Sequence, residues 1–111
     1  MDLNRVQEQL REFAKVRGWE SSHNPKNLSM ALVCEAAELM EIFQWLSGED
    51  ALRVRERSDL LAAARDEVAD VAIYLLRITD VLGIDLEKAV EAKVGKNASK
   101  YPADSPRQWK V

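Results

Sequence analysis

The chain has 111 residues, of which 47% are hydrophobic and 32% are charged, and its formal net charge is −3. This composition is typical of a single soluble domain with a modest core. A negative net charge argues against a general nucleic-acid binder, which would present a basic face. The single cysteine, Cys34, excludes a disulfide within the chain and suits a reducing compartment, so we expect a cytoplasmic protein.

Apolar side chains at helical spacing predict helices in the first half of the chain. The first helix is expected from about residue 3 to residue 17, and Gly18 ends it. A loop over residues 19–28 follows. The second helix is expected over residues 29–46, with Ser29 as its N-terminal cap.

The second half of the chain continues as helix after a charged segment. Residues 49–58 are strongly charged and are expected to form an exposed loop or a short helix. The third helix is expected to begin with Asp59 as its cap and to end at Gly83. The fourth helix is expected over residues 85–100. No segment shows the alternation that is typical of strands.

These elements predict an all-α fold, a four-helix bundle over residues 1–102 that is followed by an irregular C-terminal tail over residues 103–111. The second and third helices are apolar on most of their circumference, which so short a chain can hardly cover. We therefore expect a homo-oligomer. The longest unbroken apolar run, residues 71–76, is far below the roughly 20 residues that span a bilayer, and the charged N-terminus is unlike a signal peptide. No membrane partner is expected.

Two acidic motifs stand inside these apolar helices. Glu35-Ala-Ala-Glu38 lies in the second helix and Glu67-Val-Ala-Asp70 in the third. A spacing of three places each acidic pair on one helix face, with β-carbons about 5–6 Å apart. Carboxylates on apolar helices repel one another and resist desolvation unless a cation or a proton neutralises them. One interpretation is a divalent metal ion that all four acids bind.

The types of residue available narrow the choice of metal. Mg²⁺ prefers hard oxygen ligands and commonly uses carboxylates together with substrate phosphates, and Mn²⁺ is the alternative. The chain has no His and Cys set for zinc, and its only histidine, His23, is expected in a loop rather than in the helical motifs of a di-iron bundle. The competing interpretation is that the acids are solvated or pair with Arg65, Arg77 and lysines.

Aromatic residues near the motifs have two readings. Tyr74 follows Asp70 by one helical turn, so it is either a core residue or part of the wall of the acidic pocket. Trp19 and Trp45 each lie at a helix end near a motif. They are either ordinary core residues or surfaces on which a nucleobase stacks.

Cationic and amide side chains recur on the fourth helix. Lys93, Asn97 and Lys100 follow one another at helical spacing, beside Tyr101. Lysines on a surface helix usually serve only solubility. A row of cations and an amide opposite four carboxylates also suggests an anion that is held between them.

Taken together, the motifs resemble those of the MazG-like nucleotide pyrophosphohydrolases, and most closely the dCTP pyrophosphatase branch of that superfamily. Each acidic motif is weak evidence alone, but several segments occur in the same order with consistent spacing. The resembling segments are residues 23–28, 32–39 with 43–45, 70–75 and 93–102.

The resemblance implies a MazG-like bundle that hydrolyses a nucleoside triphosphate, dCTP or a modified dCTP, to the monophosphate and pyrophosphate with Mg²⁺. It also implies a homo-oligomer, a dimer or a tetramer, whose pockets take residues from neighbouring subunits. The implied metal ligands are Glu35, Glu38, Glu67 and Asp70. The implied substrate-binding residues are Trp19, His23, Trp45 and Tyr74 around the base and sugar, and Lys93, Asn97, Lys100 and Tyr101 around the phosphates.

Glu38 is the expected catalytic base, or the residue that orients the attacking water. The sequence offers no plausible nucleophile triad, so a covalent intermediate is not expected. The chain departs from the branch at two positions: Leu10 stands where close relatives carry a histidine, and Ser22 where they carry an aromatic residue. Both positions concern recognition of the base rather than the metal. The alternatives are a related hydrolase of dUTP or phosphoribosyl-ATP, and a non-catalytic helical interaction module.

Overall fold

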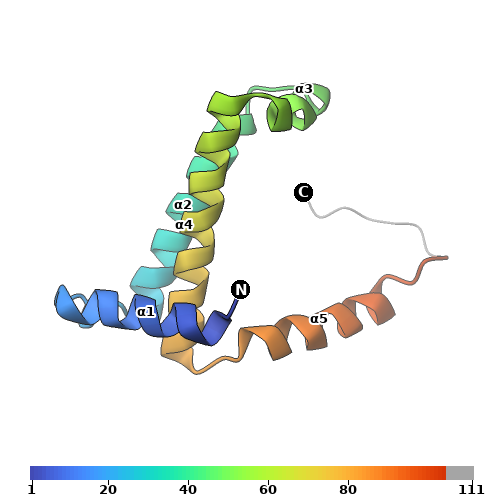
Figure 1. Ribbon diagram of the computed structural model, residues 1–111. Helices are drawn as coiled ribbons and strands as arrows, with labels where there is room; N and C mark the ends of the chain where they lie inside the picture. The colour runs from blue at the N-terminus through green and yellow to red at the C-terminus, as the bar shows by residue number, and fades with distance from the viewer. Residues whose placement is uncertain (105–111) are drawn as a thin grey trace.

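The computed structural model describes residues 1–104, which form helices and short turns, with no strand among them (Figure 1). The predicted all-α fold is confirmed. The tail predicted for residues 103–111 lies mostly outside the described part of the chain. The α-helices are α1 (Leu3–Val16), α2 (Pro25–Phe43), α3 (Gly48–Leu52), α4 (Ser58–Leu82) and α5 (Leu86–Lys100), and a 3₁₀ turn, Arg53–Glu56, follows α3.

The start of α2 differs from the prediction. Asn24 caps this helix, because its side-chain oxygen accepts a hydrogen bond from the Asn27 N–H at 2.9 Å. Pro25 takes the first helical position, where its fixed φ fits and its missing N–H costs nothing. The Ser29 hydroxyl donates instead to the Lys26 carbonyl at 2.8 Å, so Ser29 lies inside the helix rather than at its cap.

The helix ends that the sequence predicts agree with the structure better than the predicted helix starts do. Helix α4 begins at Ser58 without a side-chain cap, and Asp59, predicted as the cap, lies in its first turn. An acidic side chain there is favourable because it faces the positive end of the helix dipole. Gly83 ends α4 with a φ of +68°, and Gly18 follows α1 with a φ of +70°. Both are the left-handed conformations that glycine adopts without strain.

The molecule is built around the pair α2 and α4, which run antiparallel and side by side (Figure 1). Helix α1 lies across one end of this pair, and α3 lies at the other end. Among residues 1–104, five apolar side chains are buried, which is a small core for a chain of this length. They are Ala14, Leu28, Val54, Ala64 and Leu76.

Polar contacts fix α1 against α4. The Arg11 guanidinium donates twice to the Asp80 carboxylate, from Nη2 to Oδ1 at 2.7 Å and from Nε to Oδ2 at 3.0 Å. The hydrogen bond from Arg11 holds the pKa of Asp80 below its ordinary value. The Gln7 amide donates to the Thr79 hydroxyl at 3.2 Å and to the Leu76 carbonyl at 3.3 Å. These contacts determine how α1 covers one end of the central pair.

Helix α5 leads away from the central pair, and none of its side chains is buried (Figure 1). The sequence suggests a bundle that includes this last helix. The chain by itself does not close α5 into such a compact bundle. Exposed apolar side chains also follow one face of α2, where Met30, Val33 and Met40 are 58%, 67% and 55% exposed. No described helix has the length and apolar content needed to cross a bilayer.

Candidate active site

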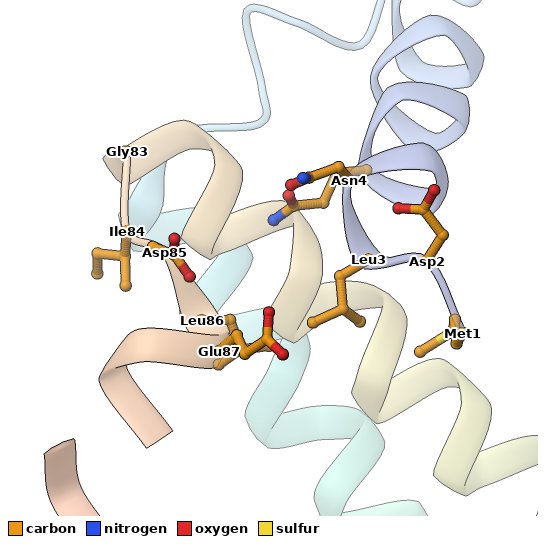
Figure 2. Close-up of a pocket in the computed structure, with 10 residues that line it drawn as sticks. Met1, Asp2, Leu3, Asn4, Gly83, Ile84, Asp85, Leu86 and Glu87 are labelled. Carbon is orange, nitrogen blue, oxygen red and sulfur yellow. The ribbon is translucent and has the colours of Figure 1, made fainter. Parts of the chain in front are cut away.

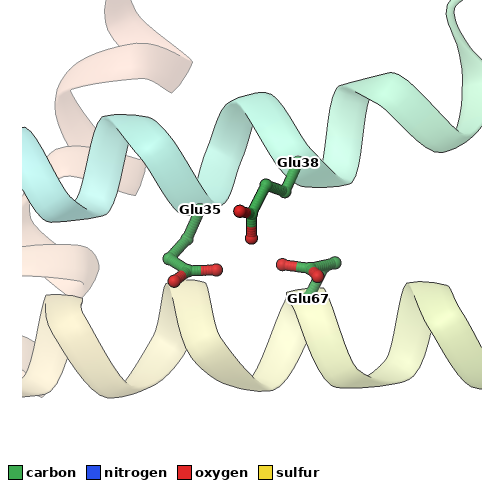
Figure 3. A group of neighbouring side chains, drawn as sticks. All are labelled: Glu35, Glu38 and Glu67. Carbon is green, nitrogen blue, oxygen red and sulfur yellow. The ribbon is translucent and has the colours of Figure 1, made fainter.

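Three of the four predicted metal ligands converge between α2 and α4 (Figure 3). Glu35 and Glu38 lie one turn apart on the face of α2 that meets α4, and Glu67 projects from α4 toward them. Each offers one carboxylate oxygen, and the three oxygens lie within 4.8 Å of one another. The antiparallel packing of two neighbouring helices therefore produces this acidic cluster.

The cluster carries buried charge that the described residues leave unpaired. The Oε2 atoms of Glu35 and Glu67 are buried and have no hydrogen-bond partner in residues 1–104. The neighbouring Glu38 carboxyl, followed by burial, raises the pKa of Glu35 to about 7. Burial raises the pKa of Glu67 as well. Orphaned oxygens and raised pKa values both indicate a site that a cation would stabilise.

The competing interpretation is that the acids are solvated or pair with Arg65, Arg77 and lysines. The ion pairs within residues 1–104 do not support such pairing. Arg77 forms an ion pair with Asp80 at 3.1 Å instead of with the cluster. The other ion pairs within residues 1–104 join Arg11, Arg53 and Arg57 to acids outside the cluster. The acidic cluster therefore has no protein cation to balance it there.

Asp70 lies beside the cluster rather than within it. Its charge helps to raise the pKa values of both Glu35 and Glu67, although neighbouring carboxyls and burial contribute more. Asp70 and Glu35 together line a cavity of about 280 Å³, which we call the aromatic cavity. This cavity opens next to the acids, and its other walls include Trp19, His23 and Tyr74. Three of the four residues predicted around the base and sugar are therefore found together.

The aromatic side chains that line this cavity contact one another. The Arg17 guanidinium lies 3.4 Å from the centre of the Phe13 ring. Phe13 meets Trp19 edge-on, with ring centres 5.7 Å apart, and the Trp19 and His23 rings are tilted with centres 5.9 Å apart. Such contacts limit the rotation of the rings, so aromatic faces are held along this wall of the cavity.

Arg77 also lines the aromatic cavity. The sequence did not predict a role in binding for this residue. Its side chain is buried, with the residue only 6% exposed. Its Nε donates to Nδ1 of His23 at 3.2 Å, and its Nη1 donates to Oδ2 of Asp80 at 3.1 Å. The only sequence signal was its position one turn beyond Tyr74 on the same face of α4.

The remaining predicted substrate-binding residues do not line the aromatic cavity of their own chain. Trp45 follows the end of α2 and is 88% exposed. The others are exposed residues that run from the middle of α5 to just after its end, and that helix leads away from the central pair α2 and α4 (Figure 1). They are Lys93, Asn97, Lys100 and Tyr101.

A second and larger cavity, of about 370 Å³, lies where the N-terminus of α1 meets the turn between α4 and α5 (Figure 2). Asp2 and Asp85 line it, but their carboxylates already cap α1 and α5 by accepting the N–H groups of Arg5 and Lys88. None of the described residues that line it is Lys, Arg or His. This cavity lies at a helix junction, and three acidic residues, Asp2, Asp85 and Glu87, are part of its lining.

The sequence matches a known protein family over most of its length. The sequence model of the MazG-like family matches residues 30–110, most of the chain. The chain belongs to the MazG-like family. The matched MazG-like region includes the whole acidic cluster and α5, whereas Trp19 and His23 of the aromatic cavity precede it.

Individual MazG-like proteins are similar over a longer stretch. The chain is 42% identical over 100 residues to dCTP pyrophosphatase 1 of Rattus norvegicus and to that of Homo sapiens, which covers 86% of this chain. It spans 56% of the length of these two relatives. A crystal structure of a pyrophosphatase from Archaeoglobus fulgidus matches with a TM-score of 0.84 at 43% identity, covering 92% of this chain and 94% of that one.

The two departures from the dCTP pyrophosphatase pattern have different surroundings in this MazG-like chain. Leu10 lines the aromatic cavity, so the wall there is apolar where the pattern has a histidine. The Ser22 hydroxyl donates to the Trp19 carbonyl at 2.9 Å, which ties down the loop that carries Trp19 and His23. Leu10 therefore bears directly on the lining of the cavity, and Ser22 bears on the shape of the loop.

Proposed function

We propose that the protein is a divalent-metal-dependent nucleotide pyrophosphatase that converts a nucleoside triphosphate, dCTP or a modified dCTP, to the monophosphate and pyrophosphate. The observation that carries the proposal is the acidic cluster, with its two orphaned buried oxygens, directly beside the aromatic cavity. A planar base fits the cavity, and metal-bound phosphates fit the cluster. The names of the rat and human relatives, dCTP pyrophosphatase 1, support the same substrate.

The proposed cofactor is Mg²⁺, with Mn²⁺ as the alternative. The cluster offers only carboxylate oxygens, which are the hard ligands these ions prefer. Glu35, Glu38 and Glu67 would hold the metal, with Asp70 at the edge toward the aromatic cavity. Bound there, the ion would neutralise charge on the phosphate oxygens.

Glu38 is the proposed catalytic residue. Its side chain is the exposed member of the cluster, so water reaches it more readily than it reaches Glu35 or Glu67. Glu38 would accept a proton from a water molecule as the water oxygen bonds to the α-phosphorus. The bond from that phosphorus to the bridging oxygen breaks, and pyrophosphate leaves.

The proposed substrate contacts divide between two subunits. Trp19, His23 and Tyr74 of one chain would surround the base and sugar in the aromatic cavity. The exposed residues Trp45, Lys93, Asn97, Lys100 and Tyr101 would reach the pocket of a neighbouring subunit, where the α5 residues would contact the phosphates. The exposed apolar face of α2 and helix α5, which has no buried side chain, support an assembly of this kind. We place the protein in the cytoplasm.

Val33→Glu is expected to dissociate the proposed dimer or tetramer. Val33 is 67% exposed and shares its face of α2 with Met30 and Met40, so a charge there would be buried in the assembly without a partner. Light scattering coupled to size-exclusion chromatography should give a multiple of the chain mass for the unmodified protein and a smaller particle for the variant. Val16→Glu, at a position that is 66% exposed at the end of α1, is the matched control. A monomeric unmodified protein would refute the assembly.

The proposed activity predicts pyrophosphate release that requires Mg²⁺. The assay measures pyrophosphate with and without Mg²⁺ across the canonical nucleotides, dUTP, 5-methyl-dCTP and phosphoribosyl-ATP. Selective release from cytosine deoxynucleotides supports the proposal in full. Release from dUTP or phosphoribosyl-ATP alone would keep the chemistry and change the substrate. A folded protein that releases no pyrophosphate and gains no stability from nucleotide with Mg²⁺ would be the helical interaction module instead.

A further inference from the structure

His23 is the only histidine of the chain, and the structure restricts where its proton can lie. Its Nδ1 receives a hydrogen bond from Nε of Arg77 at 3.2 Å. A guanidinium has only donors and stays protonated in proteins, so Nδ1 must supply a lone pair. A neutral imidazole with a lone pair on Nδ1 carries its proton on Nε2. The contact therefore fixes both the protonation state and the tautomer of His23.

The Arg77 guanidinium is itself held in place from the other side. Its Nη1 donates to Oδ2 of Asp80 at 3.1 Å, and Asp80 accepts two further hydrogen bonds from Arg11. The result is a continuous chain of contacts from α1, through Asp80 and Arg77 of α4, to the loop that carries His23. Because the Arg77 side chain is only 8% exposed, water competes little for these hydrogen bonds.

The surroundings of His23 agree with a neutral ring whose Nε2 is available to a ligand. Burial, followed by the positive charge of Arg77, lowers the pKa of His23 below its ordinary value. Within residues 1–104, no acceptor forms a hydrogen bond with Nε2, although the residue is partly buried and lines the aromatic cavity. The ring is also packed against Trp19, with centres 5.9 Å apart, which limits its rotation.

We propose that Arg77 is a positioning residue for the substrate: it holds His23 as the Nε2–H tautomer, which donates a hydrogen bond to an acceptor on the base in the aromatic cavity. The acceptor is a carbonyl oxygen or an unprotonated ring nitrogen, both of which cytosine offers. This inference rests on the proposed function, since it assigns a role within the same pocket. It makes base recognition depend on a residue of α4 that acts through His23.

The alternative is that the same contacts serve only to clamp α1 onto α4. The two roles differ in what a substitution changes. A clamp affects stability, whatever the state of His23. A positioning residue affects the tautomer of His23 and the KM for nucleotide, and leaves the chemical step at the acidic cluster nearly unchanged.

The first test is the nitrogen spectrum of the single histidine, recorded by two-bond ¹H–¹⁵N correlation on the full-length protein near neutral pH. We expect an unprotonated Nδ1 and a protonated Nε2. In Arg77→Met, which keeps the apolar stem and loses every donor, we expect a mixture of tautomers. An imidazolium or an Nδ1–H tautomer in the unmodified protein would overturn the inference. This result needs no variant, so it decides even if Arg77→Met fails to fold.

The second test is the steady-state kinetics of pyrophosphate release from dCTP with Mg²⁺. Arg77→Met is expected to raise KM about tenfold, while kcat stays within about threefold, because one hydrogen bond to substrate is weakened. Gln7→Leu is the matched control, since Gln7 clamps α1 to α4 without touching Arg77 or His23. It should leave both the tautomer and KM unchanged.

The outcomes separate the inference from the function on which it rests. An unchanged KM in Arg77→Met, or an equal rise in Gln7→Leu, would refute the positioning role. A folded wild-type protein that releases no pyrophosphate would refute the proposed function and the substrate contact of His23. If His23 nevertheless showed the Arg77-dependent tautomer, the positioning of His23 by Arg77 would stand on its own.

Discussion

Glu67→Gln is expected to lower the proposed pyrophosphatase activity by about 10²–10³-fold or more. The amide keeps the shape of the side chain but removes one negative charge and one strong oxygen ligand from the three that meet within 4.8 Å. Metal affinity should fall as well, so half-maximal activity should require more Mg²⁺, and the rate at saturating Mg²⁺ should stay low because one carboxylate is missing. Pyrophosphate release across a series of Mg²⁺ concentrations measures both effects. Asp66→Asn, at the exposed neighbouring position of α4, is the matched control and should stay fully active.

The same variant should be more stable than the wild-type protein in the absence of metal. The pKa of Glu35, about 7 in the folded chain, lies above its ordinary value, so the folded state retains this proton more strongly than the unfolded state. The contribution of Glu35 to stability is therefore fully present below its ordinary pKa and is lost as the pH rises through about 7. Glu67→Gln removes one of the neighbouring carboxyl groups that raise the pKa of Glu35. Thermal unfolding in chelator should show a smaller fall with pH for Glu67→Gln. Wild-type activity in the variant would contradict the metal site.

Asp80→Asn is expected to cost about 3 kcal/mol of the free energy of unfolding. Asp80 and Arg77 are 16% and 8% exposed at their side chains, so the substitution leaves a buried guanidinium without its counter-charge. The clamp from Arg11 is lost at the same time. Urea unfolding measures the loss. Glu49→Gln is the matched control, because the ion pair between Glu49 and Arg53 is exposed and should contribute less than about 1 kcal/mol.

The contribution of Asp80 has a defined pH dependence. Its pKa lies below the ordinary value in the folded protein, chiefly because of the hydrogen bond from Arg11. The stabilisation is therefore present above the ordinary pKa of Asp and is lost as the pH falls through the lower, folded value. The difference in stability between wild-type protein and Asp80→Asn should shrink in acid. A constant difference would show that the ion pair is not its source.

The helices could be predicted because their apolar spacing and their glycine ends are local signals. Gly18 and Gly83 both take the left-handed conformation that a helix C-terminus favours. The helix starts were less certain, since Asn24, Ser29 and Asp59 are all acceptable caps by residue type. The Pro25 that follows Asn24 decided the start of α2, a combination that the sequence contained.

The acidic cluster could be predicted because each helix presents its acids at a spacing of three, and the two helices are neighbours in the chain. The contact between Arg77 and His23 could not, since it joins a loop to a helix across 54 residues of sequence. Nothing local distinguishes a buried arginine from the many exposed ones. The direction of α5 was equally hidden, because none of its side chains is buried and no local signal in the sequence says where the helix points.

The scarcity of buried apolar side chains has a consequence for heat capacity. Unfolding raises the heat capacity in proportion to the apolar surface that it exposes to water. In an isolated chain, side chains such as Val33 and Val94, which are 67% and 62% exposed, contribute little to that change. An assembly that covers α2 and α5 would hide the same side chains and release them all on unfolding. The heat capacity change, read by calorimetry, therefore reports how much of these two helices is covered in solution.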